Sequence, residues 1–114
     1  MPRTRLIGKQ FEDQAARYLI SQGFTMITRR FTCRGGEIDL VAMDGDQLVF
    51  VEVKASRQPE IRAGESLTPE KWERMQVAAS QFFRKMEMAP QEFRVDVITI
   101  DGGEIRHFRN AAWE

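Results

Sequence analysis

The sequence has 114 residues, and 17 basic and 17 acidic side chains leave it without net charge at neutral pH. This length predicts one compact domain spanning residues 1–114, and a hydrophobic fraction of 42% excludes a chain that is disordered throughout. A single cysteine excludes an intramolecular disulfide, no apolar run is long enough to cross a bilayer, and the first residues lack a signal-peptide pattern, so we expect a cytoplasmic protein without membrane contact.

An amphipathic helix is predicted first, from Thr4 as N-cap to about Gln22, with a glycine after it. Its apolar stripe consists of Ile7, Phe11, Ala15, Tyr18 and Leu19. Glu12 falls on the border of this stripe, and Gly8, one turn earlier, leaves the space over it open. Glu12 is therefore either a carboxylate that reaches toward the sheet or an ordinary boundary residue.

A strand over 24–32 follows, and three arginines cluster near its end: Arg29, Arg30 and Arg34. Phe31 lies between them, and basic residues interleaved with an aromatic ring favour a nucleic-acid surface, although an exposed strand end explains them equally well. Residues 1–34 hold seven basic and two acidic side chains, whereas residues 35–54 hold one lysine and five acids. A basic region beside an acidic one would place phosphate contacts around a cation site.

The most informative pattern is a β-hairpin, with strands over 36–43 and 47–54 around the turn Asp44-Gly45-Asp46. Both strands are apolar on both faces, which predicts a central sheet between helices. Asp39, Glu52 and Lys54 interrupt this apolar pattern, and Glu52 and Lys54 share one face because they are two residues apart.

Asp39 joins that face only if the residue numbers of cross-strand pairs sum to an odd number. A loop of two residues would place Glu37 opposite Glu52, and a loop of four would place Asp39 opposite Glu52. A loop of three would send Asp39 to the other face unless a bulge corrected the register. We therefore predict an even loop or a bulge.

Two carboxylates about 4 Å apart repel by about 4 kcal/mol at an effective dielectric constant near 20. Burying such a pair is favourable when one takes a proton or a cation binds between them. Two carboxylates and water suit Mg²⁺ or Mn²⁺, and a lysine beside the ion can orient or deprotonate a water molecule. The alternative is structural: Glu52 and Lys54 form a salt bridge and Asp39 caps the strand end.

Residues 55–67 lack a regular period and predict a loop that either closes over a substrate or is a surface connector; it carries Arg57. Thr68 as N-cap and Pro69 at the first helical position open a second helix, and Lys71 near its start can contact phosphate. The apolar stripe of this helix, which we expect in the core, consists of Trp72, Met75, Ala79, Phe82 and Met86.

Two further strands are predicted over 93–100 and 104–108, joined by a glycine turn. Asp96 interrupts the first of them and is expected to pair with Arg94 or a neighbouring basic residue. His107 is expected to be an edge-strand residue rather than a metal ligand. The tail from residue 109 is expected to fray.

Several of these pieces together resemble the YraN-like family of predicted endonucleases in the PD-(D/E)xK superfamily, which is similar to archaeal Holliday-junction resolvases. The matching segments are Gly8-x-x-x-Glu12-x-x-Ala15-x-x-Tyr18-Leu19, Gly36-Glu37-Ile38-Asp39-Leu40-Val41, Val49-Phe50-Val51-Glu52-Val53-Lys54, Gly64, Lys71 and Phe93-Arg94-Val95-Asp96-Val97. They spread over residues 4–100. The chain departs from the family pattern at Arg30, where the family tends to have asparagine.

The resemblance implies an α/β fold of the restriction-endonuclease type: a mixed β-sheet flanked by helices, in the order α-β-β-β-α-β-β. It implies that Asp39, Glu52 and the Val53 carbonyl hold Mg²⁺ or Mn²⁺ and that Lys54 is the catalytic lysine. It also implies that Glu12 completes the catalytic set by positioning water or a second ion.

The function expected from the pattern and the resemblance together is metal-dependent hydrolysis of DNA phosphodiester bonds, in branched or repair intermediates. Nucleic-acid contacts are expected from Arg29, Arg30, Arg34, Arg57 and Lys71. Because resolvase-like enzymes address two strands, a homodimer is also expected. The alternatives are a non-catalytic nucleic-acid-binding or scaffold module that retains the fold, and a metal-dependent enzyme acting on a smaller phosphoester.

Overall fold

The computed structural model describes residues 2–55 and 68–111, which form two helices and five strands. The elements are α1 (Pro2–Ser21), β1 (Thr25–Cys33), β2 (Gly36–Asp44), β3 (Gln47–Ala55), α3 (Pro69–Lys85), β4 (Phe93–Asp101) and β5 (Glu104–Phe108). This order confirms the predicted succession of helices and strands. The predicted loop residues 56–67, including Arg57 and Gly64, lie outside the described residues.

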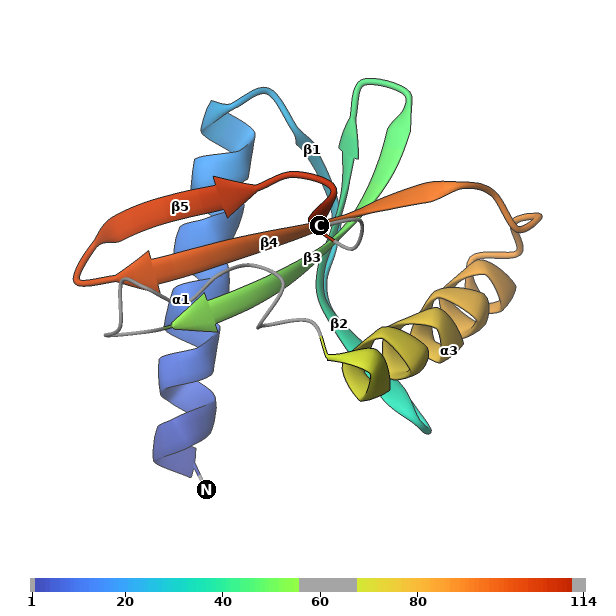
Figure 1. Ribbon diagram of the computed structural model, residues 1–114, viewed down its shortest axis with the longest axis horizontal. Coiled ribbons are helices and arrows are strands. Elements are labelled where there is room, and N and C mark those ends of the chain that lie inside the picture. Colours follow the sequence, from blue (N-terminus) through green and yellow to red (C-terminus); the bar gives the residue numbers. More distant parts are fainter. Residues whose placement is uncertain (1, 56–67, 112–114) are drawn as a thin grey trace.

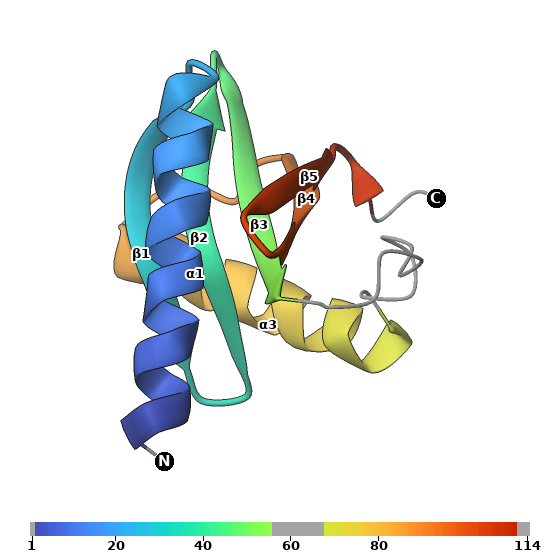
Figure 2. The same ribbon diagram turned by 90° about the vertical axis from the view of Figure 1, so that its left-hand side faces the viewer.

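The five strands form one mixed sheet in the order β1-β2-β3-β4-β5. Strands β3 and β4 are parallel, and every other neighbouring pair is antiparallel. Helix α1 lies over one face of the sheet and α3 over the other, as Figures 1 and 2 show from two directions. The predicted fold class, a mixed β-sheet flanked by helices, is therefore confirmed.

Each helix packs over its own hydrophobic core. The core under α1 includes Ala15, Ala16 and Leu19 from the helix and Leu40, Ala42, Val49 and Val51 from the sheet. The core under α3 includes Met75, Ala79 and Phe82 from the helix and Ile38, Val41, Leu48 and Phe50 from the sheet. Burial on both faces explains why the hairpin strands are apolar on both faces.

Both helix starts follow local sequence rules, one of them at a position that we did not predict. Helix α1 begins at Pro2 rather than at the predicted cap Thr4, because proline at the first turn loses no intrahelical hydrogen bond. Helix α3 begins as predicted: the Thr68 hydroxyl oxygen accepts a hydrogen bond from the Lys71 backbone N–H at 3.2 Å. Met86 is not a core residue, because α3 ends at Lys85 and leaves the methionine half exposed.

The residues after β5 are held against the sheet as far as Ala111, which is buried, so the predicted fraying from residue 109 is wrong for this part. The Asn110 backbone N–H donates to an Asp96 carboxylate oxygen at 3.0 Å, and Arg109 forms an ion pair with Asp44. Neither α1 nor α3 is long and apolar enough to cross a membrane, and these are the helices among the described residues.

Candidate active site

The hairpin adopts the register that places Asp39 and Glu52 opposite each other. Met43 pairs with Leu48 and Leu40 with Val51, so paired residue numbers sum to an odd number, as predicted. Continuing this register by one residue brings Asp39 opposite Glu52. The pairing of β2 with β3 ends at Leu40, however, and Figure 2 shows the two strands separating beyond it.

Asp39 lies in this opening between β2 and β3. Its carboxylate accepts a hydrogen bond from the Val53 backbone N–H at 2.8 Å, in the plane of the sheet where a β2 carbonyl would otherwise bind. The side-chain alternation of β2 is interrupted here, because Ile38 and Val41 both belong to the core under α3.

The Asp39 carboxyl group is poised to take a proton or a cation. Burial and the nearby Glu52 carboxylate raise its pKa to about 7, and the charges of Glu12 and Glu37 act in the same direction. The Val53 N–H opposes the shift by stabilising the anion. Near neutral pH, protonated and ionised Asp39 coexist, and a bound divalent ion would favour the ionised form.

Glu52 and Lys54 lie on the α3 side of the sheet, next to Lys71. The Lys71 ammonium group lies 3.5 Å from a Glu52 carboxylate oxygen. Lys71 also lowers the pKa of Lys54, through a side-chain hydrogen bond and charge repulsion, and burial adds to the effect. The Glu52–Lys54 salt bridge offered as the structural alternative is not among the described ion pairs, where Glu52 pairs with Lys71.

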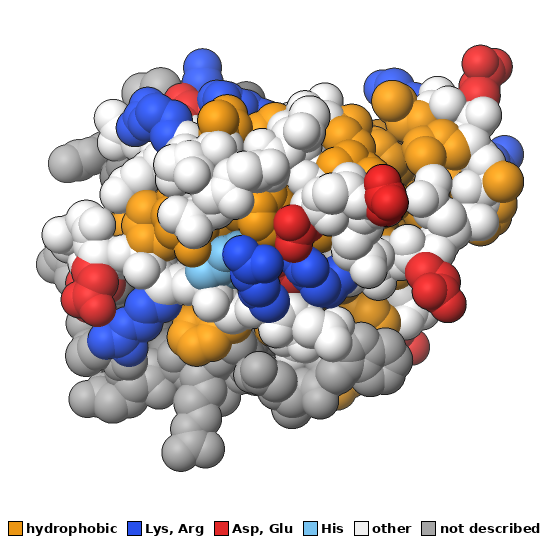
Figure 3. Space-filling view, turned by 90° about the horizontal axis from the view of Figure 1, so that it is seen from above, with side chains coloured by type: hydrophobic (Ala, Val, Ile, Leu, Met, Phe, Trp, Pro, Cys, Tyr) orange, Lys and Arg blue, Asp and Glu red, His pale blue; other side chains and the backbone are white. Residues whose placement is uncertain are grey.

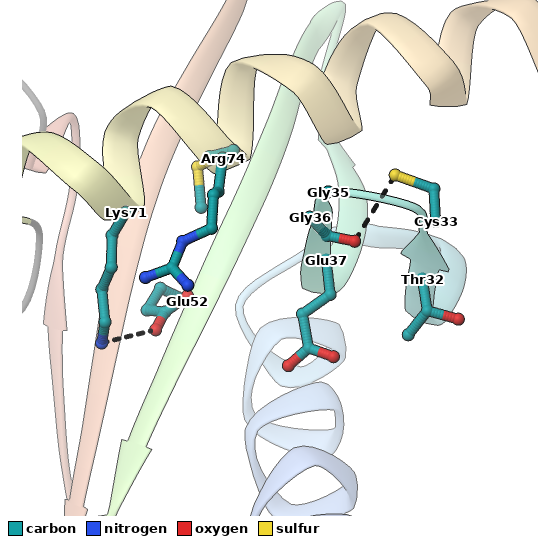
Figure 4. A pocket seen from close by; sticks show the side chains of 9 residues that line it. Thr32, Cys33, Gly35, Gly36, Glu37, Glu52, Lys71 and Arg74 are labelled. Carbon is teal, nitrogen blue, oxygen red and sulfur yellow. Dashed lines mark hydrogen bonds and ion pairs between the residues drawn. The ribbon is translucent and has the colours of Figure 1, made fainter.

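A cavity of about 550 Å³ opens beside Glu52, between α3 and the start of β2. Figure 4 shows Lys71 and Arg74 reaching from α3 toward Glu52, with Glu37 of β2 facing the same space. Gly36 brings β2 against the helix, since a Cβ atom there would lie 2.3 Å from the Arg74 carbonyl oxygen. This close approach places basic and acidic side chains around one cavity.

Glu12 is buried and directed at the sheet, as the first of its two predicted alternatives requires. Its carboxylate accepts hydrogen bonds from the Arg30 guanidinium at 2.9 and 3.3 Å. Gly8 leaves the room for this arginine, because a Cβ atom at Gly8 would lie 3.3 Å from its terminal nitrogen. Glu12 therefore has a cationic partner from the protein itself.

The donor set fits a hard divalent ion held in part by water. Asp39 and Glu52 supply carboxylates, and the Val53 carbonyl faces the same opening as its N–H, because both groups of a strand residue point to one side. Within the described ranges, no three histidine, cysteine or acidic side chains are arranged to hold one ion together. Such a two-carboxylate site suits Mg²⁺ or Mn²⁺, which retain several water ligands.

The predicted nucleic-acid contacts have different surroundings. Arg29 pairs with Asp13 of α1 at 2.7 Å, and Arg30 pairs with Glu12, so both guanidinium groups have acidic partners. Arg34 is exposed at the start of the turn between β1 and β2, and Lys71 lines the cavity.

Two charged residues of the cavity are absent from the predicted site. Glu37 precedes Asp39 by two residues on β2, and Arg74 follows Lys71 by three residues on α3. A signal was present for Arg74, because a helix period near 3.6 places it on the same face as Lys71. Glu37 reaches the cavity where the side-chain alternation of β2 is interrupted, so a strand period of two does not account for its position. Among the described ion pairs, Arg74 has no acidic partner.

A second polar cluster centres on Asp96 of β4 and joins β4 to β5 and α1. Buried Asp96 accepts hydrogen bonds from Arg94 at 2.8 and 3.0 Å, which confirms the predicted pair. His107 also contacts Asp96, at 2.8 Å, and its other ring nitrogen lies 3.1 Å from the Tyr18 hydroxyl. Figure 3 shows basic and acidic side chains gathered beside the histidine on this face.

Sequence comparison connects the chain to a widespread family. The model of the uncharacterised protein family UPF0102 matches residues 11–100. A UPF0102 protein of Herminiimonas arsenicoxydans, HEAR0176, is 49% identical over 113 residues, covering 96% of this chain and 90% of that protein. One from Ralstonia pickettii is 44% identical over 116 residues, covering 96% and 92%. The chain therefore belongs to the UPF0102 family.

Proposed function

We propose that this protein is a metal-dependent endonuclease of the PD-(D/E)xK type that hydrolyses DNA phosphodiester bonds. The observation that carries the proposal is the hairpin register, which brings Asp39 opposite Glu52 where β2 and β3 separate. Lys54 follows on the same face as Glu52, completing the acid, acid and lysine set of the YraN-like pattern. The mixed sheet between two helices supports the restriction-endonuclease-like form of the fold.

Each side chain has a task in this reaction. Asp39, Glu52 and the Val53 carbonyl would hold one divalent ion, which when bound would polarise the scissile phosphate and stabilise the leaving oxygen. Lys54 lies beside these ligands and takes a proton from the attacking water. Its lowered pKa favours the neutral amine that this step requires. Attack at phosphorus breaks one P–O bond and leaves a phosphate monoester end and an alcohol end.

The cavity beside Glu52 provides a route for the substrate backbone. Lys71 and Arg74 line its α3 side, and both guanidinium and ammonium groups bind phosphate oxygens. Arg34 is exposed near the turn that precedes β2 and extends the basic side of the same end of the molecule. Branched or repair intermediates are the proposed substrates, and cutting two strands would require two copies of the chain.

Cleavage of labelled DNA by the purified protein tests this proposal. We expect four-way junctions, flaps or duplexes to be cut with Mg²⁺ or Mn²⁺ and to stay intact with a chelator. Lys85→Met replaces an exposed lysine in the last turn of α3. It is the matched control for replacing Lys54 with methionine and is expected to keep the activity. Salt-sensitive binding without any cleavage would instead establish the non-catalytic module, and activity confined to a small phosphodiester would establish the third alternative.

A further inference from the structure

Arg29 and Arg30 both reach α1, although they are neighbours on a strand. Arg29 pairs with Asp13 and Arg30 with Glu12. Successive side chains of a regular strand point to opposite faces of the sheet, so one of the two has been redirected.

The backbone of Arg30 explains this redirection. Its φ of 50° lies in the left-handed region, which a non-glycine residue adopts only at an energetic cost. Arg29 pairs with Leu40 and Phe31 with Ile38, so Arg30 is the β1 residue level with Asp39. The strand is therefore distorted next to the acid that lies in the opening between β2 and β3.

The redirected Arg30 guanidinium lies on the α1 side of the site, near the carboxylates of Glu12, Glu37 and Asp39. Its shortest contact is to Glu12 at 2.9 Å. The hydrogen bond to Glu12 and the charges of Glu12, Glu37 and Asp39 raise the pKa of Arg30, while burial opposes the shift. The Glu12 carboxylate is buried, and a buried carboxylate needs a cationic partner. Gly8 leaves that partner its space.

We infer that Arg30 occupies the place of a second divalent ion, so that the site takes one metal ion between Asp39 and Glu52 and none at Glu12. This inference rests on the proposed function, because it assumes the first metal position. Glu12 then acts through the arginine as a positioning residue and not as a metal ligand. The guanidinium supplies a permanent positive charge on the α1 side of the site.

Counting Mn²⁺ ions by calorimetry and by electron paramagnetic resonance of the free ion tests the inference at pH 8. We expect one ion per wild-type chain. Arg30→Asn removes the charge, and asparagine tolerates the left-handed conformation, so this variant is expected to keep its fold and to bind two ions. Arg30→Met keeps the aliphatic stem and serves as a second variant with the same expected count.

Two controls separate this effect from a general change in charge. Arg29→Met removes the neighbouring arginine, which pairs with Asp13, and is expected to bind one ion. Arg30→Asn combined with Glu12→Gln is expected to return the count from two to one.

The counts separate the inference from the proposed function. Two ions in the wild type, or one ion in both Arg30 variants, would overturn the inference while leaving the metal site in place. No ion in any of the proteins would overturn the proposed function and the inference with it.

Discussion

Replacing Lys54 with methionine is expected to slow metal-dependent DNA cleavage by about 10²- to 10⁴-fold, the usual contribution of a general acid–base group. The proposed role of Lys54 is to take the proton of the attacking water. Methionine keeps much of the aliphatic bulk of the half-buried side chain and removes the amine. The rate is measured under single-turnover conditions, and circular dichroism verifies that the variant is folded.

Two further variants show which property of Lys54 matters. Lys54→Arg keeps the positive charge but cannot release a proton, so it is expected to stay as slow as Lys54→Met. Lys71→Met removes the group that most lowers the pKa of Lys54, so the rate is expected to rise with pH at higher values than in the wild type. Cleavage by Lys54→Met within a factor of three of the wild-type rate would contradict this role.

Replacing Asp96 with asparagine is expected to lower the free energy of unfolding by about 3–5 kcal/mol, the usual cost of breaking a buried ion pair. The Asp96 carboxylate is fully buried and accepts hydrogen bonds from Arg94, His107 and the Asn110 backbone. Asparagine removes the buried one of the two carboxylates that pair with Arg94, the other being Asp44. Urea unfolding measured by circular dichroism gives the difference in stability.

Asp13→Asn is the matched control for this loss, because Asp13 forms an ion pair with the half-exposed Arg29. Exposed pairs contribute about 0.2–1 kcal/mol, so the control is expected to unfold close to the wild type. Similar unfolding free energies for Asp96→Asn and the wild type would refute the stabilising role of Asp96.

The stabilisation by Asp96 and its hydrogen-bond partners is expected to depend on pH. Burial alone would raise the pKa of Asp96, but the hydrogen bonds from His107, Arg94 and Asn110 outweigh it and lower the pKa. The stabilisation is therefore present above the unfolded-state pKa of about 3.9 and is lost as the pH falls through the lower folded-state value. The difference in unfolding free energy between Asp96→Asn and the wild type is therefore expected to be full at neutral pH and to shrink in strong acid.

The hairpin is the part of the candidate site that the sequence predicted best. The positions of Asp39 and Glu52 and the turn between them limited the register to a few choices, because a strand has a period of two. Burial of both faces followed from the apolar residues that flank Asp39, and Thr68-Pro69 marked the start of α3. These features depend on neighbours in the chain, and local patterns therefore predict them.

The partners of the charged side chains were less predictable. Arg30 reaches Glu12 because Arg30 itself adopts a left-handed backbone conformation. No local sequence motif predicts this conformation for an arginine. His107 joins Tyr18 of α1 to Asp96 of β4, and this contact depends on how three distant elements pack. The sequence predicted His107 as an edge-strand residue but not its buried hydrogen bonds.

The central claim, a divalent-ion site between Asp39 and Glu52, is tested most directly by titrating Mn²⁺ into the wild type and Asp39→Asn. Asparagine can still accept the hydrogen bond from the Val53 N–H, so the variant removes the charge and keeps the local contact. We expect saturable binding to the wild type at pH 8 and weaker binding below pH 7, because a pKa of about 7 leaves Asp39 increasingly protonated there. Asp39→Asn is expected to lose this binding, and equal affinities of the two proteins for Mn²⁺ at pH 8 would contradict the claim.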